Sequence, residues 1–327
     1  MMRLLKYWKM IISRTPLRIS FVGGGSDLPS YYQRSKGAVL STSINKYIYI
    51  SLHPYFNVSK SLLKYSKTEE IDDLEDISNP LIRLSALYSG IGKGFEFTSS
   101  ADVPSGTGLG SSSSFTVGAL NVFHTYQSKL INERQLAEMA CKIEINDLKS
   151  PIGKQDQYAA SFGGLNIFEF GKNGEVTKIP VQISEDNIKH LERNLLCFYI
   201  GGSRSANEIL KEQSERMSQE TYFSIQSKMV SLVYDMKDIL ETSNLDDFGL
   251  ILDKNWKLKK QLSSGISSSY IDDLYKIGLS AGASGGKLLG AGGTGFMLFY
   301  CVPSKQENLI SNLSKLKQLN FMKLYKK

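Results

Sequence analysis

The chain has 327 residues, 41% of them hydrophobic and 22% charged, which is ordinary for a globular protein and excludes a disordered or fibrous one. Its net charge of +7 is compatible with nucleic-acid binding, but lysine and arginine are interspersed with acidic residues, so anionic small substrates account for it equally well. No run of about 18 apolar residues occurs, so we expect a cytoplasmic protein with neither a membrane nor a nucleic-acid partner.

The first strand pattern runs from Arg18 to Val22 and leads into the segment GGGSD, which ends at Asp27. Glycines allow a ligand to approach the backbone closely. The Asp27 carboxylate is suited to accept hydrogen bonds from sugar hydroxyls, although capping of the following helix is an equally simple role for it. A second strand is expected from Tyr47 to His53.

A glycine-rich loop, residues 102–114 (DVPSGTGLGSSSS), lies between a strand pattern at Phe95 to Thr98 and a helical pattern that begins at Phe115. Such a connection directs backbone N–H groups and the positive end of the helix dipole at one small volume, which suits a phosphate. A flexible glycine-serine linker is the alternative. The loop is not of the Walker type, because no lysine follows Gly110, and a dinucleotide fingerprint would need glycine at Ser111.

A helix is expected to begin at Asn132, with Gln135 completing a capping box, and to end near Lys149 because Pro151 and Gly153 follow. Its apolar face has Glu144 at one edge, and Asp156 follows shortly after the helix. One such carboxylate is able to hold Mg²⁺ while the other orients or deprotonates a hydroxyl. Taken singly, each is also compatible with a solvated surface charge.

The rest of the chain continues to mix strands with helices. Strand patterns occur at Leu165 to Phe170, Leu195 to Ile200 and Gly295 to Val302. Helical patterns run up to about Lys260 and again from Ile271 to Leu279. The absence of a regular βαβ alternation predicts the α+β class, with a domain boundary in the polar stretch 180–193.

Cysteine and histidine give no sign of cross-links. The three cysteines are odd in number, far apart and each in an apolar context, and the three histidines are equally scattered. We therefore expect reduced core cysteines at 141, 197 and 301 and no zinc site.

Three segments, in this order, resemble the motifs of the GHMP kinases. They are Arg-x-Pro-x-Arg-Ile-x-x-x-Gly-Gly-Gly-Ser-Asp (14–27), Pro-x-Gly-x-Gly-Leu-Gly-Ser-Ser (104–112) and Gly-Ala-Gly-Gly-x-Gly-Phe (290–296). The GGGSDLP form of the first motif and the segment GKQDQY (153–158) are most similar to the sugar 1-kinase branch, with its heptose phosphate kinases and fucokinases. The resemblance implies a ribosomal protein S5 domain 2-like domain at 1–187 and a ferredoxin-like domain at 188–327, with ATP and sugar bound between them.

The resemblance also implies roles for individual residues. Asp156 matches the catalytic aspartate and Arg18 the basic residue beside the attacking hydroxyl, while Ser112 and Glu144 would hold Mg²⁺. The implied ATP-binding residues are Pro104, Gly106, Thr107, Gly108, Leu109, Gly110, Ser111, Ser112 and Ser113. The implied substrate-binding residues are Asp27, Gly24, Gly25, Ser26, Gly292 and Gly293, to which we add Arg204, near an expected helix start, as a clamp for a sugar phosphate.

The implied activity is ATP- and Mg²⁺-dependent phosphorylation of the anomeric hydroxyl of D-glycero-D-manno-heptose 7-phosphate, with surface polysaccharide as the destination of the activated heptose. A fucose, galactose or N-acetylhexosamine 1-kinase is the alternative within the same enzyme class. A catalytically inactive sugar-binding sensor is the alternative outside it. In each case the expected partners are small molecules.

Overall fold

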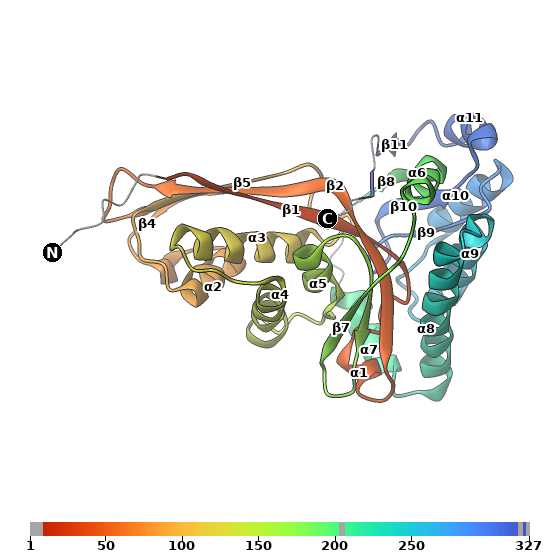
Figure 1. Cartoon of the computed structure of the whole chain (residues 1–327), viewed down its shortest axis with the longest axis horizontal. Coiled ribbons are helices and arrows are strands. Elements are labelled where there is room, and N and C mark those ends of the chain that lie inside the picture. The colour runs from red at the N-terminus through yellow and green to blue at the C-terminus, as the bar shows by residue number, and fades with distance from the viewer. Residues whose placement is uncertain (1–8, 203–206, 320–322, 325–327) are drawn as a thin grey trace.

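The computed structural model describes residues 9–202, 207–319 and 323–324, which form two sheets with their helices. In Figure 1 the first sheet and its helices fill the left and centre, and the second sheet with the later helices lies on the right. Mixed helices and strands without a regular βαβ alternation confirm the predicted α+β class.

The first sheet contains seven strands within the described residues, in the order β4-β3-β5-β2-β6-β7, with β1 paired to β2. Their bounds are β1 Ile11–Val22, β2 Gly37–Pro54, β3 Ser61–Lys64, β4 Thr68–Ile71, β5 Phe95–Ala101, β6 Leu165–Phe170 and β7 Val176–Pro180. β2 pairs with β6 through its first half and with β5 through its second half. It therefore holds both wings of the sheet together.

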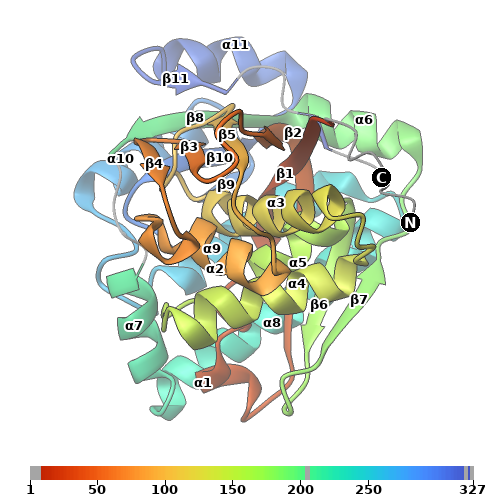
Figure 2. The same cartoon turned by 90° about the vertical axis from the view of Figure 1, so that its left-hand side faces the viewer.

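Helices cover one face of this sheet (Figure 1 and Figure 2). They are α2 Pro80–Ser89, α3 Ser111–Tyr126, α4 Glu133–Cys141 and α5 Gln155–Phe162, while the short α1 Pro29–Tyr32 follows β1. The hydroxyl of Ser13 on β1 donates a hydrogen bond to the Gly118 carbonyl of α3 at 3.1 Å. This contact places α3, and with it the glycine-rich loop, directly against β1.

The second sheet has the order β11-β8-β10-β9 and is antiparallel throughout. Its strands are β8 Leu195–Gly201, β9 Gly285–Leu288, β10 Gly295–Tyr300 and β11 Lys317–Gln318. The helices of this second half are α6 Glu185–Asn194, α7 Asn207–Arg216, α8 Glu220–Glu241, α9 Phe248–Lys259, α10 Ser269–Ser280 and α11 Pro303–Asn312, of which α8 packs against β1 and β2 of the first sheet. Among the described helices none is long and apolar enough to cross a membrane.

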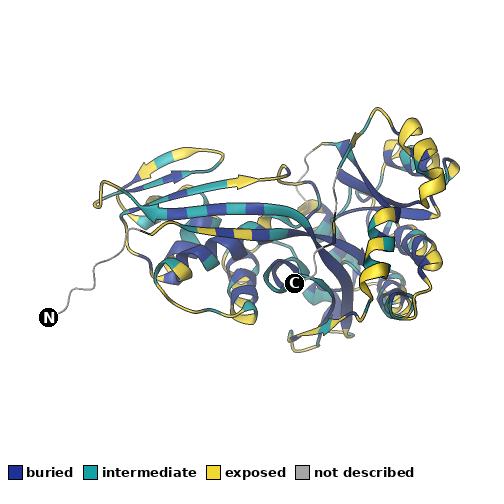
Figure 3. Ribbon diagram, turned by 45° about the horizontal axis from the view of Figure 1, so that its top comes forward, coloured by how far each residue is buried: buried dark blue, intermediate teal, exposed yellow. Residues whose placement is uncertain are grey.

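The two halves share a continuous core at the end of β1. The first half of β1 alternates between buried and more exposed residues, whereas its second half is buried throughout, as Figure 3 shows. The Phe21 ring contacts the Phe248 ring of α9 edge-on, with the centroids 5.1 Å apart. Because β1 ends between the two sheets, whatever follows Val22 lies at their junction.

One sequence-based expectation differs from the structure, and the domain boundary stays a prediction. The helix expected to run to Lys149 ends as an α-helix at Cys141 and continues as a π-helical turn, η2, over Lys142–Asp147. The polar stretch 180–193 contains α6, which begins after the Ser184 cap and whose buried face includes Leu191. The sheets separate between Pro180 and Leu195, and we keep the boundary at 187/188, inside α6, as a proposal.

The capping box at Asn132 is confirmed, and it generates a stability prediction. The Asn132 side chain accepts a hydrogen bond from the Gln135 backbone N–H at 2.9 Å, and the Gln135 side chain accepts one from the Asn132 N–H at 3.0 Å. Asn132→Ala should lower the free energy of unfolding by about 1 kcal/mol, as measured by urea denaturation, because a helix N–H loses its acceptor. Asn132→Ser keeps an acceptor and should retain most of that stability. Equal losses in both variants would contradict the capping role.

Candidate active site

A cleft of about 410 Å³ lies at the junction of the two halves. It is walled by the end of β1, the glycine-rich loop, η2, α5, the end of α9, β9 and the glycine-rich segment before β10. The predicted site residues that line it are Arg18, Gly24, Gly25, Asp27, Gly106, Gly108, Gly110, Ser111, Ser112, Ser113, Glu144, Asp156 and Gly292. Segments far apart in the sequence thus converge on one cavity.

Of the remaining predicted site residues, those that the structure describes are not among the residues that line the cleft. Thr107 and Leu109 are buried, and the Ser26 hydroxyl donates to the Ala38 carbonyl at 2.9 Å and accepts from its N–H at 3.0 Å. The Gly293 N–H donates to the Ile266 carbonyl. Pro104 lines a second cavity, and Arg204 lies outside the described residues.

Arg18 and Asp156 form a two-pronged ion pair at the base of the cleft. Arg18 Nε donates to Asp156 Oδ1 at 2.7 Å and Nη2 donates to Oδ2 at 2.6 Å. The third nitrogen, Nη1, donates to the Gly108 carbonyl at 2.6 Å. The Arg18 side chain is 4% exposed and that of Asp156 is 24% exposed, so the carboxylate remains accessible from the cleft. This geometry fixes the carboxylate in a single orientation.

Asp27 lies in the turn after β1 and is buried. Its Oδ1 accepts from the Gly25 N–H at 3.1 Å and its Oδ2 from the Gln155 N–H at 3.2 Å. Burial, aided by repulsion from Asp156, raises the pKa of Asp27. The second of these hydrogen bonds ties the turn to the first turn of α5, next to Asp156.

Glu144 projects from η2 towards the first turn of α3. Its Oε1 accepts from the Ser112 hydroxyl at 2.8 Å and its Oε2 from Gln157 Nε2 at 2.6 Å. Burial raises the pKa of Glu144. The π-helical turn widens the helix at this position, a feature often found at functional sites. Sequence reasoning gave Gln157 no role, although the segment GKQDQY (153–158) contains it.

The glycine-rich loop delivers the N-terminus of α3 to the cleft. Gly110 has a φ of 73° at the N-cap position, and no side chain among the described residues caps the helix. The first N–H groups of the helix are therefore available to an anion, which the helix dipole also favours. Gly108 has a φ of 83°, and any β-carbon there would collide with the Leu289 carbonyl. The loop is thus held against the glycine-rich segment before β10.

Two buried lysines complete the wall of the cleft, and sequence reasoning missed the role of both. Lys287 Nζ donates to the carbonyls of Ser20 and Phe21 at 2.7 and 2.9 Å, and burial lowers its pKa well below the ordinary value. Lys259 ends α9 and donates to the Gly290 carbonyl. Lys259 follows Leu252 and Trp256 at helical spacing, so a lysine on the buried stripe of α9 was the available signal.

A second cavity, of about 610 Å³, lies on the other side of the glycine-rich loop. It shares Leu81, Gly106, Ser111 and Ser112 with the cleft. Tyr65 and Phe115 contribute aromatic surface to it. The loop therefore lies between two cavities, one lined by several charged groups and the other with aromatic surface.

Comparisons with known proteins find relatives for both halves of the chain. The model of the GHMP kinases N terminal domain matches residues 79–164, and the model of the GHMP kinases C terminal domain matches residues 236–316. The D-glycero-alpha-D-manno-heptose 7-phosphate kinase of Campylobacter jejuni is 32% identical over 319 residues, covering 94% of both chains. The L-fucokinase/L-fucose-1-P guanylyltransferase of Bacteroides fragilis is 23% identical, and the match covers 88% of this chain but 34% of that protein.

Among solved structures, a D-glycero-D-manno-heptose 1-phosphate kinase from Bacteroides thetaiotaomicron superimposes with a TM-score of 0.80 at 25% identity. The superposition covers 97% of this chain and 96% of that one. The mevalonate kinase of Methanococcus jannaschii has a TM-score of 0.76 at 21% identity over 97% of this chain. The whole described architecture is therefore shared, including both sheets.

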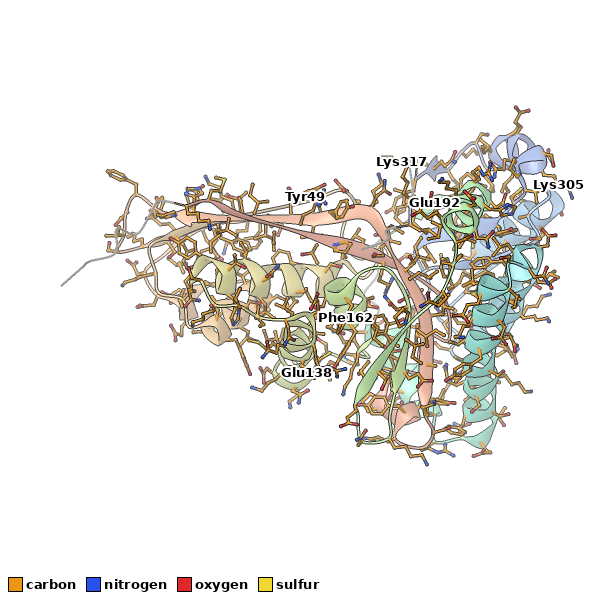
Figure 4. The ribbon with its side chains drawn as sticks, viewed as in Figure 1. Tyr49, Glu138, Phe162, Glu192, Lys305 and Lys317 are labelled. Atoms are coloured by element: carbon orange, nitrogen blue, oxygen red, sulfur yellow. The ribbon has the colours of Figure 1, made fainter. Side chains whose placement is uncertain are left out.

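The buried carboxylate of Glu144 makes stability depend on pH. Because its pKa is raised from 4.5 on folding, the folded chain binds a proton more readily than the unfolded chain, and the ionised form opposes folding at neutral pH. The free energy of unfolding of Glu144→Gln should therefore increase relative to that of the unmodified chain as the pH rises from 5 to 8. Urea denaturation at several pH values measures this difference. Glu138→Gln, on the exposed side of α4 (Figure 4), is the matched substitution. A stability difference that falls with rising pH would contradict the raised pKa of Glu144.

Proposed function

The chain belongs to the GHMP kinase family, and we propose that it transfers the γ-phosphoryl group of ATP to the anomeric hydroxyl of D-glycero-D-manno-heptose 7-phosphate. The product is the 1,7-bisphosphate. The observation that carries the proposal is the oriented Arg18–Asp156 pair beside an uncapped helix N-terminus in one cleft. The identity of 32% to a heptose 7-phosphate kinase over nearly the whole chain supports the choice of sugar.

The glycine-rich loop is suited to hold the triphosphate. Phosphoryl transfer requires alignment and positive charge more than covalent chemistry, and the first turn of α3 offers both N–H donors and the helix dipole. The second cavity begins on the other side of the same loop and has room and aromatic surface for a nucleoside. This arrangement supports ATP, with its base in the second cavity and its terminal phosphate in the cleft.

The oxygens of Ser112 and Glu144 fit Mg²⁺. Their hydrogen bond of 2.8 Å places a hydroxyl and a carboxylate next to the predicted phosphate position. Two protein ligands are sufficient, because Mg²⁺ retains waters and binds substrate phosphates. When bound, the ion would neutralise phosphate charge and orient the γ-phosphate. Gln157 keeps the Glu144 carboxylate turned towards Ser112.

We assign to Asp156 the role of accepting a hydrogen bond from the attacking hydroxyl and of taking its proton. An anomeric hydroxyl is more acidic than an ordinary alcohol, so orientation is a large part of this role. Arg18 keeps Asp156 directed into the cleft through its two donors, and its positive charge offsets the charge on the transferring group. Asp27, Gly24 and Gly25 line the adjoining wall, where sugar hydroxyls would bind.

A fucose 1-kinase is the second candidate, because two bifunctional fucokinases match most of this chain. The chain spans about a third of their length, so it corresponds to one part of each. For the heptose assignment, we further infer from family resemblance that the product feeds nucleotide-activated heptose for surface polysaccharide in the cytoplasm. The intact arrangement of Asp156, Arg18 and Glu144 favours a working kinase over a sugar sensor.

A substrate panel tests the assignment. The purified chain with ATP and Mg²⁺ should form a 1-phosphate from heptose 7-phosphate with a kcat/KM at least tenfold above those for fucose, galactose and N-acetylhexosamines, because recognition of a substrate phosphate adds charged hydrogen bonds. ADP release and anomeric 31P NMR signals provide the readout. Faster turnover of fucose would transfer the assignment to the second candidate. Sugar binding with no ADP release would support the sensor.

Asp156→Ala should lower kcat on the order of 10²-fold or more, since the attacking hydroxyl loses its orienting acceptor. Thermal unfolding should show that the variant remains folded. The matched control is Asp235→Ala, which removes an exposed carboxylate from α8 and should leave kcat unchanged. Near-normal turnover of the Asp156 variant would remove this residue from the mechanism.

A further inference from the structure

Three cationic side chains among the described residues line the cleft: Arg18, Lys259 and Lys287. Each of the three Arg18 nitrogens already donates a hydrogen bond, two of them to Asp156. Lys287 divides its donors between two backbone carbonyls of β1. Lys259 is different, because its ammonium makes one hydrogen bond, to the Gly290 carbonyl, and no ion pair within the described residues.

The position of Lys259 connects it to the glycine-rich loop (residues 102–114), which from here on is called the phosphate loop. Gly290, whose carbonyl accepts from Lys259, packs backbone to backbone against Gly108. The carbonyl of Gly108 in turn accepts from Arg18. Lys259 and Arg18 therefore bind backbone carbonyls at the same loop–loop contact, and both line the cleft.

The charged groups around Lys259 lie on β1, in the turn that follows it, on α5 and on β9. Arg18 on β1 and Lys287 on β9 repel it, while Asp27 after β1 and Asp156 on α5 attract it. Burial, followed by the repulsion from Arg18, lowers the pKa of Lys259 to about 8. Lys259 is therefore largely protonated at pH 7 and loses its charge as the pH rises through 8.

A purely structural role does not account for a lysine here. Lys259 is 6% exposed, and burying an ammonium costs several kcal/mol unless an anion or several acceptors compensate. One carbonyl is poor compensation, and two of the three N–H donors of the ammonium remain for a ligand. An anion that enters the cleft beside Gly108 would supply acceptors for these two N–H donors.

We propose that Lys259 binds the γ-phosphoryl oxygens of ATP and follows that group as it passes to the acceptor. The inference rests on the proposed function in that ATP is the donor. In the transfer, the anomeric oxygen forms a bond to the γ-phosphorus, the bond to the β-phosphate oxygen breaks, and the hydroxyl proton moves to Asp156. Lys259 stays protonated throughout and offsets charge on the transferring oxygens.

Nucleotide affinity tests the proposal without any sugar. In calorimetry at pH 7 with Mg²⁺, Lys259→Met should raise the Kd for the β,γ-imido analogue of ATP about tenfold and leave the Kd for ADP unchanged, since only the analogue carries the γ-phosphate. Lys257→Met is the matched control on the same helix, because Lys257 is 65% exposed and pairs with Asp253. Equal weakening of ADP and the analogue, or no weakening of either, would overturn the proposal.

The pH profile provides a second test that a structural role would not pass. For the unmodified enzyme, kcat/KM should fall about tenfold between pH 7 and pH 9, because this ratio reports groups of the free enzyme. Lys259→Arg keeps both charge and donors, so its profile should stay level over that range. A fall that persists in the arginine variant would exclude Lys259 as its cause.

The outcomes also separate this inference from the proposed function. If the unmodified chain binds neither nucleotide, the kinase assignment itself fails. If the panel selects another sugar, the nucleotide test of Lys259 still stands. A Lys259→Met variant that raises KM for heptose 7-phosphate but not for heptose, with unchanged analogue affinity, would assign Lys259 to the acceptor phosphate and overturn its assignment to ATP.

Discussion

The ion pair between Arg18 and Asp156 is the interaction on which the site depends. It joins the last part of β1 to the first turn of α5, and the third guanidinium nitrogen adds the phosphate loop through Gly108. The pairing of β1 with β2 shifts register between Pro16 and Arg18, so the strand is irregular where the arginine leaves it. A lysine at this position would supply the charge without the planar fork that reaches two oxygens and a carbonyl together. The orientation of Asp156 is therefore fixed by the fold.

The cleft around this ion pair contains further charged side chains whose burial destabilises the folded chain. Burial raises the pKa values of Asp27 and Glu144 and lowers those of Lys259 and Lys287. Each of these groups therefore lies at a position where desolvation destabilises its charged form. In a core, well-packed apolar side chains would be more stable than such a set. The cost is consistent with a site prepared for a highly charged ligand, because prearranged charge needs no reorganisation when the ligand reacts.

Sequence patterns predicted best those features that depend on a few neighbouring residues. The capping box at Asn132 and the glycines of the phosphate loop were predictable, because a side-chain cap and a positive φ are decided within a few residues. The α+β class also followed from local patterns. The π-helical turn that presents Glu144 was not predictable, since it differs from an α-helix by a single inserted residue. Helical spacing puts Lys259 on the buried stripe of α9, but the roles of Lys259 and Lys287 arise only when α9 and β9 meet the end of β1.

The contact between Gly108 and Gly290 explains how the glycine-rich segment before β10, which has few side chains, still determines the shape of the cleft. Any β-carbon at Gly290 would collide with the Gly108 backbone, so both loops approach as bare backbone. Arg18 binds the carbonyl on one side of this contact and Lys259 the carbonyl on the other. The two sheets therefore meet, at the point where phosphate is expected, through a backbone contact held between two cations. Lys259 lies on α9, which packs against β9, whereas the phosphate loop leads into α3 of the first half. The position of Lys259 relative to the loop therefore depends on how the two halves of the chain pack.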